Sequence, residues 1–204
     1  MLVNAFCVSS LDAQYSCTLF LLQIVWENRN LGNNNGSRAR VTVDGTDFRI
    51  LEPIPFNVKW FSHKFSGPGL RYEIGISIQT GDIVWVHGPF LCGEWPDLRI
   101  AREALVYALD AGEMYLADGG YLDGNNWSDT PNGLNNLEQY QKSLARARHE
   151  TVNARFKMWG ALRQQYRHKK ESHWAVLNAI ANITQLTIRN GEPLFQVHYD
   201  ENDH

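Results

Sequence analysis

Cysteine is scarce in this chain, and its spacing is irregular. The 204 residues include Cys7, Cys17 and Cys92, an odd number without a C-x-x-C pair. Disulfide frameworks and structural zinc sites need paired cysteines, so neither is expected, and an intracellular protein is indicated. The seven histidines show no H-x-x-x-H or H-E-x-x-H spacing, which argues against a histidine-based zinc site as well.

Long apolar runs are also missing. The most apolar stretch, from Cys17 to Trp26, is ten residues long, whereas a membrane-spanning helix needs roughly 20. No Lys or Arg precedes Arg29, and Asp12 lies upstream of the apolar stretch, so the pattern is not that of a secretory signal. We therefore expect neither a membrane segment nor a leader peptide.

The composition is that of one globular domain, but its charge is unevenly spread. Hydrophobic residues make up 44% and charged residues 20%, and the net charge is −3. From Glu73 to Asp129 ten acidic residues stand against two basic ones, whereas from Leu137 to Lys170 nine basic residues stand against two acidic ones. A basic surface for nucleic acid is therefore compatible with an acidic chain.

A carboxylate interrupts the β-branched run from Val41 to Ile50. Asp44 is followed by Gly45, and Asp-Gly between alternating runs is a hairpin signal. Alternatively, Asp44 lies near the end of a core strand, where its carboxylate could hold a metal ion. This stretch alone leaves both interpretations open, with the turn ahead. Asp47, three residues on, would point to the opposite face of a continuous strand.

The middle of the chain predicts a hairpin, a helix and a short buried strand. Arg71–Gln79 and Ile83–Val86 read as paired strands around a Thr-Gly-Asp turn. Pro96 suits a helix start, and Asp97 in the first turn is explained by the helix dipole. Met114–Ala117 then forms a buried strand that leads directly into Asp118.

The basic segment predicts a long amphipathic helix from Leu137 to about His168. Its apolar positions recur at spacings of three and four; they are Leu137, Tyr140, Leu144, Ala147, Thr151, Ala154, Met158 and Leu162. Glu150 falls on the edge of this stripe with Arg146, Asn153 and Lys157. An exposed ion pair between Arg146 and Glu150 is the simpler explanation of that glutamate.

The remaining segments carry weaker signals. Residues 1–30 form a short lead-in, in which Leu19–Asn28 could be helical, and residues 31–190 form the main domain. Asn57–Gly69 reads as a surface loop, 123–136 as a long irregular loop, and Val176–Ile188 as a short helix or strand. Residues 191–204 form an acidic tail that we expect to fray.

Asp44, Asp118 and Glu150 make more sense together than apart. Two aspartates at the ends of apolar strands and a glutamate on the inner edge of a helix would repel one another if they converged without cations. Hard divalent cations prefer oxygen ligands, and a pair of them can activate water and stabilise a leaving oxygen in phosphodiester transfer.

A series of motifs resembles the DDE superfamily endonuclease domain of Harbinger-type eukaryotic transposases, over roughly residues 24–188. The resemblance is carried in order by Val43-Asp44-Gly45-Thr46, Gly93-x-Trp95-Pro96-Asp97, Ala117-Asp118-Gly119-Gly120-Tyr121 and Arg148-His149-Glu150, followed by Arg155-Phe156-Lys157 and Trp159-Gly160. It implies a ribonuclease-H-like α/β fold, with a five-stranded mixed sheet flanked by helices. It also implies that Asp44, on the central strand, Asp118 and Glu150 form the catalytic triad and bind two Mg²⁺ or Mn²⁺ ions.

The function implied is cleavage and strand transfer of double-stranded DNA at transposon ends, in the nucleus. The phosphate contacts expected near the site are Arg146, Arg148, Arg155 and Lys157. Residues 1–30 are too short for the usual DNA-recognition module, so a separate DNA-binding partner is expected, as is a homo-oligomer in the active form. The alternative is a domesticated, non-catalytic DNA-binding or protein-interaction module that keeps the fold.

Overall fold

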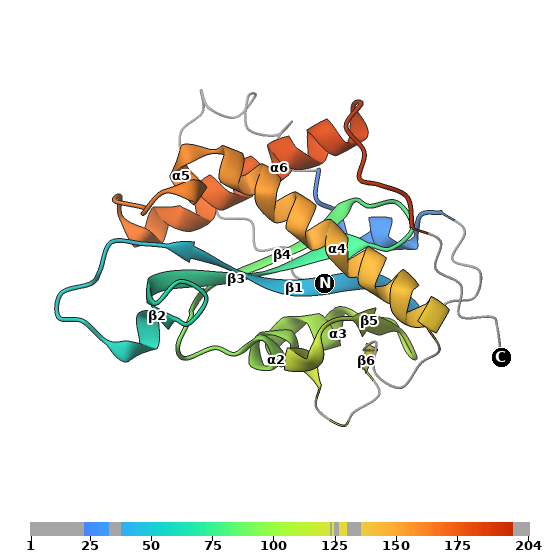
Figure 1. The fold of residues 1–204 in the computed structure, drawn as a ribbon, viewed down its shortest axis with the longest axis horizontal. Helices are drawn as coiled ribbons and strands as arrows, with labels where there is room; N and C mark the ends of the chain where they lie inside the picture. Colours follow the sequence, from blue (N-terminus) through green and yellow to red (C-terminus); the bar gives the residue numbers. More distant parts are fainter. Residues whose placement is uncertain (1–22, 33–37, 123, 125–126, 130–135, 198–204) are drawn as a thin grey trace, which may run out of the picture.

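The molecule is built on a mixed β-sheet with helices on both of its faces (Figure 1). The computed structural model describes residues 23–32, 38–122, 124, 127–129 and 136–197. Its strands are β1 (Ala39–Arg49), β2 (Phe61–Ser62), β3 (Gly67–Ser77), β4 (Ile83–Leu91), β5 (Met114–Leu116) and β6 (Ser128–Asp129). The expectation of a mixed α/β fold is confirmed.

The long strand β1 lies in the middle of the sheet. It pairs antiparallel with β3 from Val41, opposite Ser77, to Arg49, opposite Gly69. On its other side it pairs parallel with β5. β4 extends the sheet antiparallel to β3, and β6 extends it parallel to β5. The order is therefore β4-β3-β1-β5-β6, with the short β2 beside the beginning of β3.

The two sides of β1 are paired over different lengths. β5 ends at Leu116, which lies opposite Thr42. Among the described residues, the next backbone pairing on that side is the bridge between Ile50 and Tyr166. The stretch of β1 between these two pairings borders an interruption of the sheet, which we call the sheet gap. Asp44 lies within it.

Helices form a layer on each face of the sheet (Figure 1). On one face lie α4, α5 and α6, and on the other a short helical segment made of α2, η3 and α3. The helical elements are η1 (Trp26–Asn30), η2 (Val58–Trp60), α2 (Asp97–Ile100), η3 (Ala101–Leu105), α3 (Val106–Ala108), η4 (Gly119–Tyr121), α4 (Asn136–Met158), α5 (Gly160–Arg163), η5 (Lys170–Ser172) and α6 (His173–Arg189). Within the described residues, no helix is long and apolar enough to cross a membrane.

The alternation of side chains along β1 supplies both helix layers with a core. Phe48 faces α4 and α6 and packs with Phe156 and Leu177. Val41 and Val43 face the other layer and pack with Leu105. Because successive side chains of a strand point to opposite faces, an almost wholly buried strand supplies apolar contacts to both layers.

The structure differs from the sequence prediction at Asp44–Gly45, where no turn occurs. β1 continues through both residues to Arg49, so the hairpin interpretation is wrong. Gly45 has another physical role. A Cβ atom added there would lie 2.1 Å from Oδ1 of Asp97. Glycine at this position makes room for a close approach by the beginning of α2.

The predicted long helix is shorter and turned to another face. α4 ends at Met158, because Trp159 has extended backbone angles, and the short α5 follows. Tyr140 and Met158, expected to face inward, are exposed. The side chains that point into the protein are Lys142, Ala145, Arg148, His149, Val152 and Phe156.

Other expectations can be compared directly. The hairpin of β3 and β4 and the buried strand β5 are confirmed. Val176–Ile188 lies within the helix α6, which settles the choice between helix and strand. The segment 57–69, expected to be a loop, contains η2, β2 and the beginning of β3. Residues 1–22, most of the loop 123–136 and the acidic end of the tail lie outside the described residues.

Candidate functional site

Two of the predicted carboxylates meet at the sheet gap because neighbouring parallel strands bring them there. Asp44 is two residues beyond Thr42, the last residue of β1 that β5 pairs with. Asp118 is two residues beyond Leu116, the partner of Thr42. Asp118 also caps η4, since its Oδ1 accepts a hydrogen bond from the Gly120 N–H at 2.9 Å. The cap fixes the carboxylate where the chain leaves the sheet.

The pKa of Asp44 reports a crowded acidic environment. This pKa is raised to about 6, chiefly by burial and in part by the charges of Asp97 and Asp118. The nearby ammonium of Lys64 and the N–H of Gly45 act in the opposite direction. Lys64 donates a hydrogen bond to the Gly45 carbonyl at the gap. A positive charge therefore already stands beside these three carboxylates.

Asp97 is a site residue that the sequence interpretation missed. It is the first residue of α2, and its Oδ1 lies 3.2 Å from Nη1 of Arg71. Burial raises its pKa, Arg71 lowers it, and Asp118 is among the acidic neighbours that raise it. A helix-dipole role does not explain this position between β1 and Asp118. The available signal was Gly45, since a glycine inside a strand often marks a close approach.

Two hydrogen bonds hold α4 against β1 on either side of Asp44. Oγ1 of Thr42 lies 2.8 Å from Nε2 of His149, and Oγ1 of Thr46 lies 2.5 Å from Oδ1 of Asn153. Asp44 lies midway between the two threonines on the same face of β1, and Glu150 lies between the two partners on α4. Asp44 and Glu150 line one cleft of about 360 Å³.

Asp44 is thus close to each of the other two predicted carboxylates, but in different ways. Asp118 acts on the pKa of Asp44, and Glu150 lines the same cleft. Within the described part of the chain, no three Asp, Glu, His or Cys side chains are grouped closely enough to hold one metal ion. The donor set consists of hard carboxylate oxygens, which suit Mg²⁺ or Mn²⁺. The residue types therefore fit such an ion, although the side chains do not form a closed ligand shell.

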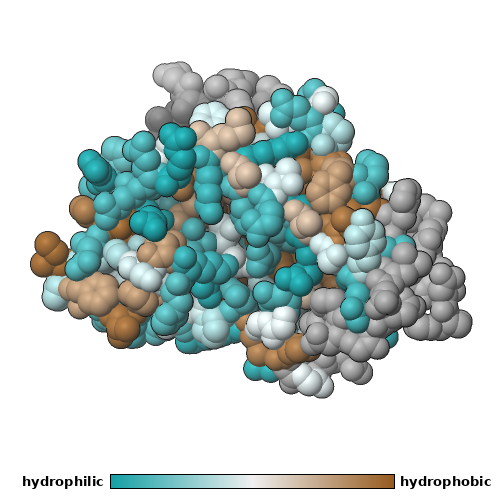
Figure 2. Space-filling model, in the orientation of Figure 1, coloured by the Kyte–Doolittle hydropathy of each residue, from teal (hydrophilic) through white to brown (hydrophobic). Residues whose placement is uncertain are grey.

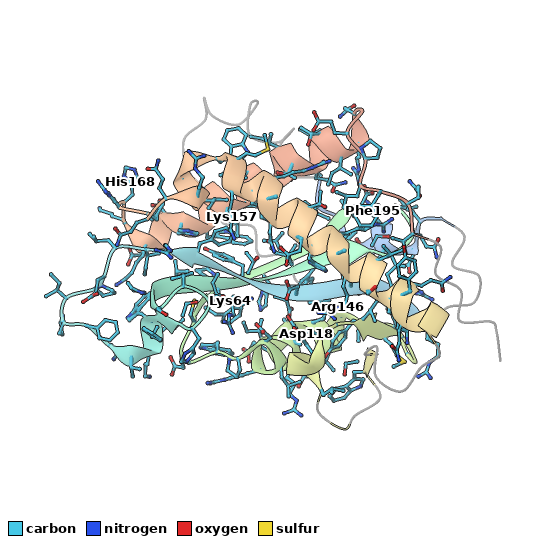
Figure 3. The ribbon with its side chains drawn as sticks, viewed as in Figure 1. Lys64, Asp118, Arg146, Lys157, His168 and Phe195 are labelled. Carbon is cyan, nitrogen blue, oxygen red and sulfur yellow. The ribbon has the colours of Figure 1, made fainter. Side chains whose placement is uncertain are left out.

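The predicted basic residues separate into different environments. Lys157 lines the cleft. Nη2 of Arg146 lies 3.8 Å from Oδ2 of Asp118, and Figure 3 shows these two side chains near one another below α4. Arg155 donates to the backbone carbonyl of Glu192 at 2.8 Å, away from the cleft.

Arg148 cannot serve as a surface contact for DNA. Its side chain is 1% exposed. The guanidinium donates hydrogen bonds to the carbonyls of Ser77, Ile78 and Phe195 at 3.2, 2.6 and 2.8 Å. Burial lowers its pKa to about 10. Arg148 therefore joins α4, the end of β3 and the C-terminal segment, and we remove it from the expected phosphate contacts.

Glu73 adds a buried carboxyl group beneath the site. It lies opposite Gly45 on β3 and is fully buried. Burial raises its pKa to about 8, although the Trp85 Nε1–H, which donates to Oε2 at 2.9 Å, and the Tyr121 hydroxyl lower it. At neutral pH the group is mostly protonated, so it adds little negative charge to the cluster.

The fold and the site together define a mixed α/β domain with an acidic cleft at an interruption of its sheet, bordered by cations. Comparison with protein-family models, curated proteins and solved structures found no match. The function is therefore argued from the cleft itself.

Proposed function

We propose that the chain is the divalent-metal-dependent DNA endonuclease and strand-transfer domain of a Harbinger-type DDE transposase, with a ribonuclease-H-like fold. The observation that carries this proposal is the pairing of His149 and Asn153 with β1 on either side of Asp44. It seats α4 against β1 so that Glu150 and Asp44 line the same cleft, and Asp118 follows the neighbouring parallel strand β5. Asp44 and Glu150 thus border one cleft, and Asp118 lies close enough to Asp44 to raise its pKa.

The sheet also supports the proposed fold. The resemblance implies a five-stranded mixed sheet with the first aspartate on the central strand. The sheet has six strands; without the short β2, the path β4-β3-β1-β5-β6 has five, of which β3 and β4 form antiparallel pairs and β5 and β6 form parallel pairs. Asp44 lies on β1, the middle strand of that path.

Asp44, Asp118 and Glu150 would hold the metal. A divalent cation there would polarise the phosphodiester and lower the pKa of water. The chain itself would supply negative charge for the ion, because the pKa of Asp44, about 6, leaves its carboxylate mostly ionised at neutral pH. Lys157 lines the same cleft and offers positive charge to the non-bridging phosphate oxygens.

The test is nicking of supercoiled plasmid in Mg²⁺ or Mn²⁺ by the natural chain and by Asp44→Asn, Asp118→Asn and Glu150→Gln. Each substitution keeps the side-chain shape and removes a charge. We expect each to lower the nicking rate by about 10²–10³-fold, the range seen when one group that stabilises a transition state is removed. Glu192→Gln, which changes an exposed acid away from the cleft, should leave the rate unchanged. Equal nicking by the natural chain and Asp44→Asn would overturn the proposal.

A non-catalytic DNA-binding module is the second candidate, and the arrangement of charges favours it in one respect. Lys64 and Arg146 already place cations beside Asp44 and Asp118, and the described acidic side chains form no closed metal site. Titration of the natural chain with Mn²⁺ separates the candidates. A nuclease should bind the ion and lose binding in Asp44→Asn, whereas the module should bind DNA without binding the ion.

The substrate and setting belong to the same proposal. The substrate would be double-stranded DNA at transposon ends and at the target, processed in the nucleus. A homo-oligomer and a separate DNA-binding partner would complete the active form. Sedimentation of the chain with and without terminal-repeat DNA would measure the oligomer directly.

A further inference from the structure

A second hollow continues the cleft along the end of β1. It has a volume of about 500 Å³ and lies between the turn that precedes β3 and the segment that follows α5. We call it the α5 groove, and its walls include Arg49, Phe65, Ser66, Arg163, Gln164 and Arg167. Arg49, Phe65 and Arg163 also line the cleft that contains Asp44. The two hollows are therefore adjacent and share part of their walls.

The acidic side chains are confined to one of the two hollows. The cleft contains Asp44, Asp47 and Glu150 beside four basic residues, whereas no Asp or Glu lines the α5 groove among the described residues. Arg163 and Arg167 are exposed, and neither has an ion-pair partner in the part of the chain that the structure describes. Their guanidinium groups are free to pair with an anion that enters the groove.

The groove walls are held in place by the backbone. The Tyr166 N–H donates to the Arg49 carbonyl at 2.9 Å, and the Leu51 N–H donates to the Tyr166 carbonyl at 2.8 Å. The buried ring of Tyr166 packs 4.8 Å from that of His173. The segment that carries Arg163 and Arg167 is therefore anchored to the end of β1, which lowers the entropy cost of ordering the site on binding.

The opposite wall restrains a third arginine. The guanidinium carbon of Arg49 lies 4.8 Å from the ring centroid of Phe65, a cation–π contact that orients its planar group. A planar guanidinium pairs with two phosphate oxygens at once. Three arginines on two fixed walls suit a chain of phosphates better than a single small anion.

We propose that the α5 groove binds the phosphate backbone of one DNA strand and leads that strand into the cleft at Asp44. The identity of the ligand as DNA rests on the proposed function. The presence of the groove, its positive charge and its position beside the cleft do not depend on that function. One strand is proposed because a hollow of about 500 Å³ has no room for a duplex. The exposed amide of Gln164 provides a further donor beside the two arginines.

The test measures binding without cleavage. Fluorescence anisotropy of a labelled oligonucleotide is recorded in EDTA from about 50 to about 200 mM salt, over which phosphate-dominated binding weakens strongly. For the double variant Arg163→Gln/Arg167→Gln we expect weaker binding to every sequence. The slope of log affinity against log salt should become shallower by about two, close to one for each lost phosphate contact.

Arg38→Gln is the matched control for the two single variants, Arg163→Gln and Arg167→Gln, since it also removes one arginine charge, just before β1 and roughly 35 Å from Arg49 by the rise of an extended strand. It should keep the natural slope. Equal salt slopes for the double variant and the natural chain would overturn the proposal that the α5 groove binds DNA. The outcomes for the two proposals can also be told apart. If nicking depends on Asp44 but the double variant keeps the natural salt slope, only the groove proposal fails. If the double variant has a shallower slope but the natural chain does not nick DNA, only the nuclease proposal fails.

A second measurement covers the case in which the double variant is misfolded. A p-benzoylphenylalanine in place of Gln164 should crosslink to the oligonucleotide on illumination. The same group in place of Tyr107, which is 82% exposed on α3 on the opposite face of the sheet, should not. Crosslinking from both positions, or from Tyr107 alone, would contradict the proposed strand path.

Discussion

At the scale of single residues, Gly45 makes room for the acidic cluster. Its missing Cβ leaves the space into which Oδ1 of Asp97 extends from α2. For Gly45→Ala we expect unfolding in urea to show a loss of about 1–3 kcal/mol, the usual cost of overpacking. The added methyl group must displace a carboxylate that Arg71 also holds.

The control for this substitution is Gly160→Ala. A Cβ at Gly160, the first residue of α5, would meet no atom within 4 Å, so stability should be unchanged or slightly increased. If both alanine variants were equally stable, the close approach of Asp97 would not be a constraint on β1.

Glu73 predicts an unusual dependence of stability on pH. Its pKa is about 8 in the folded state because of burial and near 4.5 when unfolded. Between these values the folded state holds a proton that the unfolded state has released, so stability falls as pH rises from about 4.5 to about 8. The loss should be on the order of a few kcal/mol.

Urea unfolding at pH 5 and pH 8 measures this effect. Glu73→Gln, which is neutral at both values, should remove most of the difference and be the more stable protein at pH 8. Glu192→Gln, at an exposed position, should keep the natural difference. An unchanged pH response in Glu73→Gln would show that Glu73 ionises normally in the folded chain.

The sequence predicted the site residues whose position is set by neighbours in the chain. It was less informative for residues whose position is set by distant contacts. Asp118 follows a short buried strand, and the structure places it directly after β5. Asp97 has no such signal, because its importance depends on Gly45, more than fifty positions earlier. Contacts of that kind arise from packing between layers, which sequence periodicity does not contain.

At the scale of elements, α4 shows why hydrophobic periodicity can indicate the wrong face. Its inward positions include Arg148 and His149, whose polar atoms are hydrogen-bonded to carbonyls and to Thr42. Buried polar groups are tolerated when their hydrogen bonds are satisfied. Counting them as outward-facing shifted the predicted stripe around the helix, toward exposed Tyr140 and Met158.

Two helices are docked by uncharged histidines. Burial lowers the pKa of His149 on α4 to about 3 and that of His173 on α6 to about 4. His173 Nδ1 lies 2.8 Å from the Tyr72 hydroxyl on β3. In the unfolded chain both titrate near 6.5. Their contribution to stability is therefore complete above pH 6.5 and is lost as pH falls toward 4.

Thermal unfolding followed by circular dichroism between pH 7 and pH 4.5 tests this prediction. The natural chain should lose stability steadily over this range. His149→Gln with His173→Asn, whose amides retain hydrogen-bonding atoms near Nε2 and Nδ1, should start less stable but change less with pH. A pH response as steep as that of the natural chain would assign the acid lability to other groups.

At the scale of the whole molecule, the uneven charge of the sequence becomes a spatial arrangement. The acidic segment supplies Glu73, Asp97 and Asp118, whereas the basic segment supplies Lys157, Arg163 and Arg167. Figure 2 shows hydrophilic side chains over most of the face that carries α4. The two segments meet beside the cleft, where Nη2 of Arg146 lies 3.8 Å from Oδ2 of Asp118, so a net charge of −3 does not describe what a DNA strand would meet there.

The overall architecture was predicted more reliably than its boundaries. The expected mixed α/β class, with a mixed sheet and flanking helices, is what the structure has. The sheet gap was not predicted, because it depends on β5 being only three residues long. The length of a short strand is decided by the neighbours available to it, which a single segment does not specify.

The two hydrogen bonds between β1 and α4 also have a consequence for folding. Each joins residues separated by 107 positions, and the pairing of β1 with β5 closes a loop of more than seventy residues. Contacts of such long sequence separation carry a high loop-closure cost and tend to make folding slow. The cleft therefore exists only once the native topology is complete, and a newly made or partly folded chain presents no assembled acidic site.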